Sequence, residues 1–149
     1  SLSQVCSRFQ VHELLTIQDI FVGSSNYIAE QSAPQPLTEL IEQPIMMLEK
    51  DNVTRAYIDA YLEKQKVAVK PEIEIGSLEF LIDFARIGLG VSLVIRNFVQ
   101  KELKERLLTE ITVVPAIPPR KIGLVIPQQL PISIAAEGFI SLLLETAPP

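Results

Sequence analysis

The sequence is poor in the residues on which several common protein classes depend. Among its 149 residues it has no tryptophan, one cysteine (Cys6) and one histidine (His12). A single cysteine cannot form an internal disulfide, and one cysteine with one histidine cannot build a zinc site without several carboxylates. Lysine and arginine number 13 against 18 acidic residues, which gives a net charge of −5. Because nucleic-acid backbones are bound by clustered positive charge, we expect no direct contact between this chain and DNA.

Motifs of catalysis, cofactor binding and membrane insertion are also missing. The sequence contains no Gly-x-Ser-x-Gly elbow and no P-loop, and the stretch from Gly88 lacks the third glycine of a dinucleotide-binding turn. No apolar run approaches the ~20 residues of a spanning helix, and the first residues do not form a signal peptide. We therefore expect no enzyme, no catalytic residue, no cofactor and no metal, and the cytoplasm as the default location.

What the sequence does contain is abundant aliphatic material, in a pattern that alternates between strand and helix. Hydrophobic residues make up 48% of the chain. The short apolar run Pro44–Leu48 is typical of a strand buried on both faces of a parallel sheet. The pattern predicts further strands over Val11–Val22, Glu72–Ile75, Val91–Ile95, Leu108–Val114 and Lys121–Ile126, and helices over Val53–Lys66, Leu78–Ile87, Asn97–Arg106 and from the Ser133 cap to about Leu144.

Helical spacing predicts which side chains these helices bury. The expected inward residues are Ala56, Tyr57, Ala60 and Tyr61 in the first long helix, Phe80, Leu81, Phe84 and Ala85 in the second, and Ile134, Phe139, Leu142 and Leu143 in the last. Gly88 is expected to end a helix with positive φ, and Gly90 to allow a tight turn.

This order of elements predicts an α/β fold with an open, parallel-rich sheet and flanking helices. In such sheets ligands bind outside the carboxyl ends of the strands. Here those ends lie at Leu48–Asn52 and Ile75–Ser77, and each of them leads into the start of a helix.

The turn Lys50–Arg55 is the first candidate ligand site. The N–H groups at the start of the helix carry the positive end of its dipole, which suits a carboxylate or phosphate. Asn52, Val53 and Thr54 would supply these amides together with polar side chains. The alternative is that Asn52 only caps the helix and that Arg55 is a solvated surface residue.

Gly76 and Ser77 form the second candidate, at the start of the next helix. Ser77 could contact a ligand or act as a plain N-cap, and both roles are compatible. Three polar residues of the first strand, Thr16, Gln18 and Asp19, could reach a hinge, but a solvated edge is the preferred interpretation because a buried carboxylate needs a partner. The remaining special residues are expected to have no ligand contact: Gly88 and Gly90 are assigned as turn residues, His12 to the surface or an interface, and Cys6 no role.

The stretch EIGSLEFLIDFARIGLGVSLVI, residues 74–95, resembles the signature region of LysR-type effector domains. The similarity extends on both sides through LIEQPIMMLEKDNVTRAYIDAYLEKQKVAVKPEIEI, the return segment LLTEITVVPAIPPRKIGLVIPQQLPISIAAEGFISLLL and the outgoing strand TIQDIFVGSSNY. No single motif decides the matter, but the ordered series covers about Val11 to Leu144.

The resemblance implies a type II periplasmic-binding-protein-like fold of two lobes. Residues 1–23 would be the end of the first lobe and the crossover strand, 24–106 the second, effector-binding lobe, and 107–149 the return strand and last helix of the first lobe. The family's helix-turn-helix and most of its first lobe have no counterpart here, so the chain resembles an incomplete copy. DNA would be a partner only through that absent module.

The implied function is that of a regulatory domain which binds a small, anionic effector between its lobes and thereby modulates transcription. Effector contacts would come from Asn52, Val53, Thr54, Gly76 and Ser77, the corners at which the family binds its ligands. The resemblance also implies homodimers or tetramers of the chain. The alternative is a periplasmic-type solute-binding protein, which has the same two-lobed architecture.

Overall fold

A computed structural model of the chain describes residues 9–26, 33–128 and 131–146. Cys6, for which no role was expected, lies outside these residues. The chain forms two compact units: unit 1 contains Ser1–Ile17 and Pro119–Pro149, and unit 2 contains Gln18–Pro118. The chain therefore passes from one unit to the other twice, between Ile17 and Gln18 and between Pro118 and Pro119.

Unit 2 is built on a five-stranded sheet in the order β5-β4-β6-β2-β7. As predicted, the three strands β4, β5 and β6 are parallel, while β2 runs antiparallel to both β6 and β7. Every residue of the three central strands is buried, which explains the continuous apolar run of β4 and the mostly apolar sequences of β2 and β6. The bounds are β2 Asp19–Ser24, β4 Ile45–Leu48, β5 Ile73–Ile75, β6 Val91–Ile95 and β7 Leu108–Ile111.

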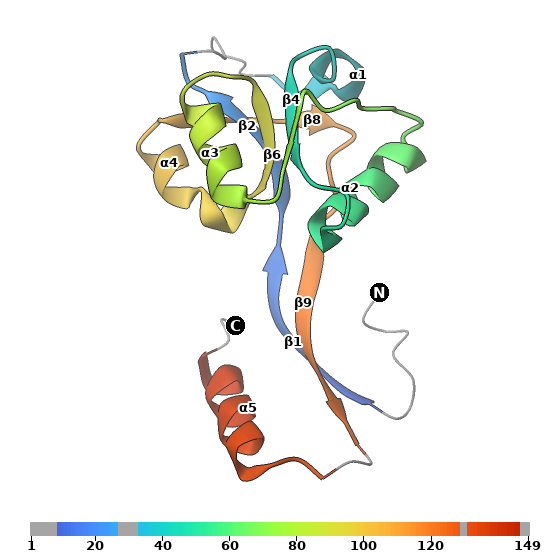
Figure 1. The fold of residues 1–149 in the computed structure, drawn as a ribbon, viewed down its shortest axis with the longest axis vertical. Helices are drawn as coiled ribbons and strands as arrows, with labels where there is room; N and C mark the ends of the chain where they lie inside the picture. The colour runs from blue at the N-terminus through green and yellow to red at the C-terminus, as the bar shows by residue number, and fades with distance from the viewer. Residues whose placement is uncertain (1–8, 27–32, 129–130, 147–149) are drawn as a thin grey trace. The chain divides into compact units, whose positions relative to one another are not determined.

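Helices cover both faces of this sheet (Figure 1). On one face, α1 and α2 pack over a cluster that contains Phe21, Met47 and Leu93. On the other face, α3 and α4 pack over Met46 and Val94. The bounds are α1 Leu37–Leu40, α2 Val53–Lys64, α3 Leu78–Arg86, the 3-10 turn η2 Arg96–Phe98 and α4 Gln100–Lys104; a short parallel pair joins β3 Gln35–Pro36 to β8 Val113–Val114.

The single strand predicted over Val11–Val22 is wrong, because the chain divides it at Gln18. Its first part is β1, Phe9–Ile17, in unit 1, and its second part is β2 in unit 2. The burial of the two parts differs accordingly: all six residues of β2 are buried, whereas most of β1 is exposed or half-buried. Local periodicity cannot reveal that one extended stretch serves two different sheets.

The predicted inward faces of the helices are partly wrong. In α2, Tyr61 is buried as expected, but Ala56 and Ala60 are exposed and the buried positions include Ile58 and Leu62. In α3, Leu81 and Ala85 are buried, whereas Phe80 is 54% exposed and stacks on Phe84 with a centroid separation of 6.2 Å. In α2 the side chains that face the sheet therefore lie at a different rotation of the helix from the predicted one. In α3 the prediction is wrong only for Phe80, since Phe84 is half-buried against the core cluster.

The two turn glycines are required for different reasons. Gly88 has φ +82°, as predicted for the residue that ends α3, and its N–H donates to the carbonyl of Ala85 at 3.0 Å. Gly90 allows a close backbone approach: a Cβ there would lie 2.4 Å from the carbonyl oxygen of Pro44, directly before β4. The N–H of Val91 donates to the same carbonyl at 2.9 Å, and this hydrogen bond holds the start of β6 beside that of β4.

Unit 1 consists of an antiparallel ribbon and a helix. β1 pairs with β9, Arg120–Pro127, with a register shift between Glu13 and Leu15. The helix is α5, Ile134–Thr146, and the N–H of Ala136 donates to Oγ of Ser133 at 3.2 Å, which confirms the predicted cap. His12 lies on β1 opposite Leu124 of β9.

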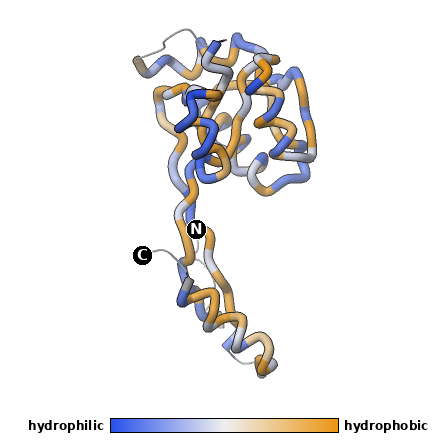
Figure 2. The backbone as a smooth tube through the Cα atoms, turned by 90° about the vertical axis from the view of Figure 1, so that its left-hand side faces the viewer, coloured by the Kyte–Doolittle hydropathy of each residue, from blue (hydrophilic) through white to orange (hydrophobic). Residues whose placement is uncertain are grey.

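The apolar residues of α5 are mostly not buried, contrary to the predicted inward stripe. Figure 2 shows this helix largely in hydrophobic colour. Ile134, Phe139 and Leu142 are all exposed, and Leu143 is half-buried. An apolar hollow of about 420 Å³, lined by residues of β9 and α5, lies within the same unit.

Candidate functional site

The two predicted ligand-binding corners lie on the same rim of the sheet of unit 2. β4 and β5 are parallel neighbours, and their last residues, Leu48 and Ile75, lie opposite each other in the register. Just beyond, the N–H of Glu49 donates to the carbonyl of Ile75 at 3.2 Å. The turns that follow, with Asn52–Thr54 after β4 and Gly76–Ser77 after β5, therefore open at the same end of adjacent strands.

The first corner is a well-formed helix start. Oδ1 of Asn52 accepts a hydrogen bond from the N–H of Thr54 at 2.8 Å, and the carbonyl of Asn52 accepts from the N–H of Ala56 at 3.0 Å. Asn52 and Thr54 are half-buried, whereas the side chain of Val53 is 80% exposed. Val53 can therefore offer a ligand its backbone N–H rather than its side chain.

The second corner has a looser cap and an acidic neighbour. Oγ of Ser77 accepts from the N–H of Phe80 at 3.5 Å, the outer limit of a hydrogen bond, so this hydroxyl is only weakly engaged. A Cβ added to Gly76 would lie 3.3 Å from Oε2 of Glu49. The carboxylate of Glu49 therefore lies over the Gly76 backbone, between the two corners.

Arg55 is not the solvated surface residue that the alternative interpretation of this turn assumed. Its side chain is only 4% exposed and bonds to three elements. Nη1 donates to the carbonyl of Leu48 at 2.7 Å, at the end of β4, and to Oε2 of Glu74 at 2.8 Å, on β5. Nε donates to Oδ1 of Asp59 at 2.8 Å, one turn along α2. Arg55 thus ties the start of α2 to the ends of both strands that carry the candidate corners.

Electrostatics favour a permanent charge on this guanidinium. Burial by itself lowers the pKa of Arg55, but the hydrogen bonds and charges of Asp59 and Glu74 outweigh that effect and raise the pKa above its ordinary value. The sequence contained one usable signal for this arrangement, the i, i+4 spacing of Arg55 and Asp59. It contained none for Glu74, which only the pairing of β4 with β5 brings close.

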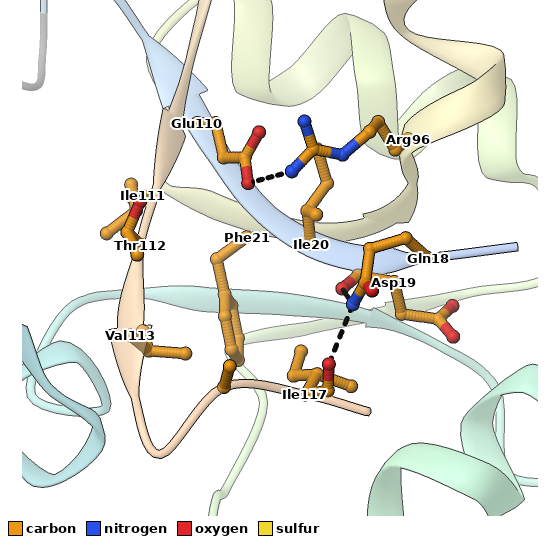
Figure 3. A pocket seen from close by; sticks show the side chains of 11 residues that line it. Gln18, Asp19, Ile20, Phe21, Arg96, Glu110, Ile111, Thr112, Val113 and Ile117 are labelled. Carbon is orange, nitrogen blue, oxygen red and sulfur yellow. Dashed lines mark hydrogen bonds and ion pairs between the residues drawn. The ribbon is translucent and has the colours of Figure 1, made fainter. Parts of the chain in front are cut away.

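A cavity of about 220 Å³ lies at the strand ends on the other side of β6, where β2 begins and β7 ends (Figure 3). At the edge of this cavity, Nε2 of Gln18 donates to the carbonyl of Ile117 at 2.8 Å. Arg96 and Glu110, which form an ion pair, also line the cavity. Asp19 lines the cavity and is 1% exposed, so the interpretation of a solvated edge is wrong for this residue.

Sequence reasoning named Gln18 and Asp19 as hinge candidates but missed Arg96, Glu110 and Thr112, which also line the cavity. Their spacing along the chain carries no signal, because the order β6-β2-β7 brings them together. Thr16, the third hinge candidate, is exposed on β1 in unit 1. None of the five predicted effector contacts lines this cavity.

Two further features bear on the metal-binding and membrane-spanning classes considered from the sequence. In the part of the chain that the structure describes, no three His, Cys, Asp or Glu side chains are grouped as metal ligands. Among the helices of those same residues, none is long and apolar enough to cross a membrane.

Comparison with known proteins decides the family. Residues 3–148 match the LysR substrate binding domain. The chain belongs to this family. No curated protein was found to match the sequence.

Solved structures with the same fold include a regulatory domain and an effector-binding domain. The CcmR regulatory domain of Synechocystis PCC6803, in complex with 2-PG, has a TM-score of 0.81 and 18% identity, over 93% of this chain and 67% of that one. The effector-binding domain of QuiR, in complex with shikimate, has a TM-score of 0.76 and 13% identity, over 97% and 68%. At these identities the likeness shows the fold alone.

This LysR substrate-binding domain therefore has the type II periplasmic-binding-protein-like α/β fold expected from its sequence. It spans about two thirds of the two regulatory domains and 48% of full-length HypT from Salmonella typhimurium, a hypochlorite-specific LysR-type transcriptional regulator (TM-score 0.75, 16% identity, 98% of this chain). Unit 2 contains β2, β7 and β8 in addition to the elements within 24–106, and the lobe bounds expected from the sequence stay a prediction.

Proposed function

We propose that this chain is the ligand-sensing part of a LysR-type transcription regulator, and that a small, anionic effector binds at the rim formed by Asn52–Thr54 and Gly76–Ser77. The observation that carries the proposal is the shared rim: two polar helix starts follow adjacent parallel strands. Ligands of open α/β sheets bind outside such strand ends.

The α2 corner supplies the attraction for a negative charge. The first N–H groups of a helix have no acceptor within the helix, and Asn52 satisfies only that of Thr54. The N–H groups of Val53 and Arg55 are therefore directed to a ligand, with the positive end of the helix dipole behind them. Because the Glu49 carboxylate covers Gly76, the anionic group of the effector belongs at α2 and an uncharged hydroxyl or amide near Ser77.

The proposed output is a change in the affinity of an attached helix-turn-helix for DNA. The effector stabilises one arrangement of the regulatory domain over another, and only its differential affinity for the two can shift the equilibrium. The proposal includes homodimers or tetramers in the cytoplasm. A periplasmic-type solute-binding protein has the same fold class, but the match to the LysR family favours the regulator.

A thermal-shift screen of the purified chain against small carboxylates and phosphates, with 2-PG and shikimate included, tests the proposal. A ligand that binds only the folded chain raises the melting temperature, and titration calorimetry then gives its Kd. We expect Thr54→Ala and Ser77→Ala to weaken binding of the hit by about 5–30-fold, because each removes a hydroxyl hydrogen bond. Ser141→Ala, a substitution on the exposed surface of α5, is the matched control and should leave Kd unchanged. An equal Kd in wild type, Thr54→Ala and Ser77→Ala would place the ligand elsewhere.

A further inference from the structure

Helix α2 carries the candidate effector corner at its start, and two tyrosines further along it are bonded to the segment through which the chain leaves unit 2. Tyr57 and Tyr61 lie one helical turn apart. Oη of Tyr57 donates to the carbonyl of Pro118 at 2.8 Å, and Oη of Tyr61 donates to the carbonyl of Pro115 at 2.6 Å. Both bonds therefore connect one helix to the same four residues.

The segment Pro115–Pro118 is well suited to follow a movement of α2. Its two prolines restrict φ, which limits its backbone conformations, and three of its carbonyls accept hydrogen bonds from side chains of other elements. Ile117 is buried in the core cluster beneath α2, and its carbonyl accepts a hydrogen bond from Nε2 of Gln18. Gln18 is the first residue of unit 2 and Pro118 is its last, so this one bond joins the two crossings of the chain.

The start of α2 is fixed as firmly. Arg55 bonds the first turn to the carbonyl of Leu48 and to Glu74. All three anchors, Arg55, Tyr57 and Tyr61, lie on one helix of 12 residues, a stiff element about 18 Å long. A shift of its first turn must therefore move the tyrosine hydroxyls as well.

The hydroxyl of Tyr61 is also available as a donor under all ordinary conditions. Its residue is 6% exposed, and burial raises the pKa of Tyr61 above its usual value. The phenol consequently keeps its proton at neutral pH and continues to donate to Pro115.

We propose that Tyr57 and Tyr61 are positioning residues that couple the effector corner, through α2, to both crossings between the units. This inference rests on the proposed function for the identity of the corner, and it specifies how occupancy of that corner reaches the rest of the regulator. A ligand that draws on the N–H groups of Val53 and Arg55 would shift α2, and the two hydroxyls would carry that shift to Pro115–Pro118 and on to Gln18.

A double-mutant cycle in the ligand-free chain tests the coupling, with amide hydrogen exchange measured by NMR. Asn52→Ala removes the N-cap of α2 and thus perturbs the corner alone. In the wild-type background we expect it to speed exchange of the Ala116 and Ile117 amides by about five-fold, the size of the effect of one lost cap. In the Tyr57→Phe/Tyr61→Phe background, which keeps both rings, Asn52→Ala should change those two amides by less than about two-fold.

Exchange at the Ala56 amide, inside the first turn of α2, provides the local control. It should rise after Asn52→Ala in both backgrounds, because the cap is lost in both. Ser133→Ala, which removes the cap of α5, is the matched control and should leave Ala116 and Ile117 unchanged. If Asn52→Ala prevents folding, Asn52→Gly gives the same perturbation in a milder form, since glycine is tolerated at this position.

Equal effects of the cap substitution at Ala116 and Ile117 in both backgrounds would overturn the proposal, because the hydroxyls would then transmit nothing. So would the absence of any effect there while Ala56 responds. Since no effector is used, this result is independent of the ligand screen: a chain that binds no carboxylate or phosphate can still show the coupling, and a chain that binds one can lack it.

Discussion

Replacement of Arg55 by methionine should destabilise the chain more than the replacement of an exposed charged residue on a helix. Methionine keeps most of the buried volume of the side chain but removes all three hydrogen bonds. Asp59 and Glu74 are 46% and 36% exposed, so water can solvate their carboxylates and each lost pair costs at most about 1 kcal/mol. The carbonyl of Leu48 is different, because its bond to Arg55 is buried and the loss of a charged donor there costs about 1.5–3 kcal/mol.

Together these contributions predict a loss of about 2–4 kcal/mol in the free energy of unfolding for Arg55→Met. For a chain of this length the melting temperature should fall by about 6–12 °C. Arg55→Lys should lie between wild type and Arg55→Met, because one ammonium group cannot reach all three acceptors in the geometry of a planar guanidinium. Urea unfolding followed by circular dichroism measures each difference.

Arg86→Met is the matched control. Arg86 also lies on a helix and is also paired, with Asp83 at 3.0 Å, but both side chains are about half exposed. Its replacement should cost less than about 0.5 kcal/mol. The reasoning fails if the two methionine variants lose the same stability, or if Arg55→Met is as stable as wild type, since the buried bond to Leu48 would then contribute nothing.

Three further outcomes follow from single features of the structure. Gly90→Ala should lower the free energy of unfolding in urea by about 1–3 kcal/mol, because its Cβ would lie 2.4 Å from the carbonyl of Pro44. Gly138→Ala in α5 meets no atom within 4 Å and should be neutral or stabilising. Equal stability of the two variants would contradict the close approach at Gly90. Glu49→Gln should tighten binding of an anionic effector by about 2–10-fold in calorimetry, and less at high salt; weaker binding would show that Glu49 contacts the ligand favourably. Burial raises the pKa of Tyr61 in the folded chain, so the stabilising contribution of its neutral phenol is present below the unfolded pKa of about 10 and is lost as the pH rises above that value. Wild type should therefore lose more stability than Tyr61→Phe between pH 9 and pH 11. Parallel losses in the two proteins would refute this prediction.

Local signals in the sequence were sufficient for much of unit 2. Short apolar runs predicted β4 and β6 because strands buried on both faces need no alternation. Asn52 and Ser77 were recognisable as helix caps, and Gly88 as the residue with positive φ, because each of these roles depends only on neighbours in the chain. The candidate corners followed from the same signals, since a parallel order of strands directs their carboxyl ends to one rim.

Burial of charged residues could not be predicted in the same way. Asp19 was expected at a solvated edge, and the alternative interpretation of the Lys50–Arg55 turn placed Arg55 at the surface, but both residues are buried. For Arg55 the deciding contact is Glu74, 19 residues away along the chain but on the neighbouring strand. A charge can be buried only where partners converge on it, and that convergence depends on which strands are adjacent.

The amino-acid sequence alone determined the type and order of most elements, the caps at the two candidate ligand corners and the family to which the chain belongs. Periodicity, capping and the ordered series of motifs all depend on residues that are neighbours in the chain. Only the tertiary structure decided that the extended stretch from Phe9 to Ser24 divides at Gln18 between two units, that Arg55 joins α2 to β4 and β5, and that Tyr57 and Tyr61 hold the segment Pro115–Pro118. The physical reason is the same in each case: hydrogen bonds between residues far apart in the chain form only after the order of strands in the sheet has brought them together.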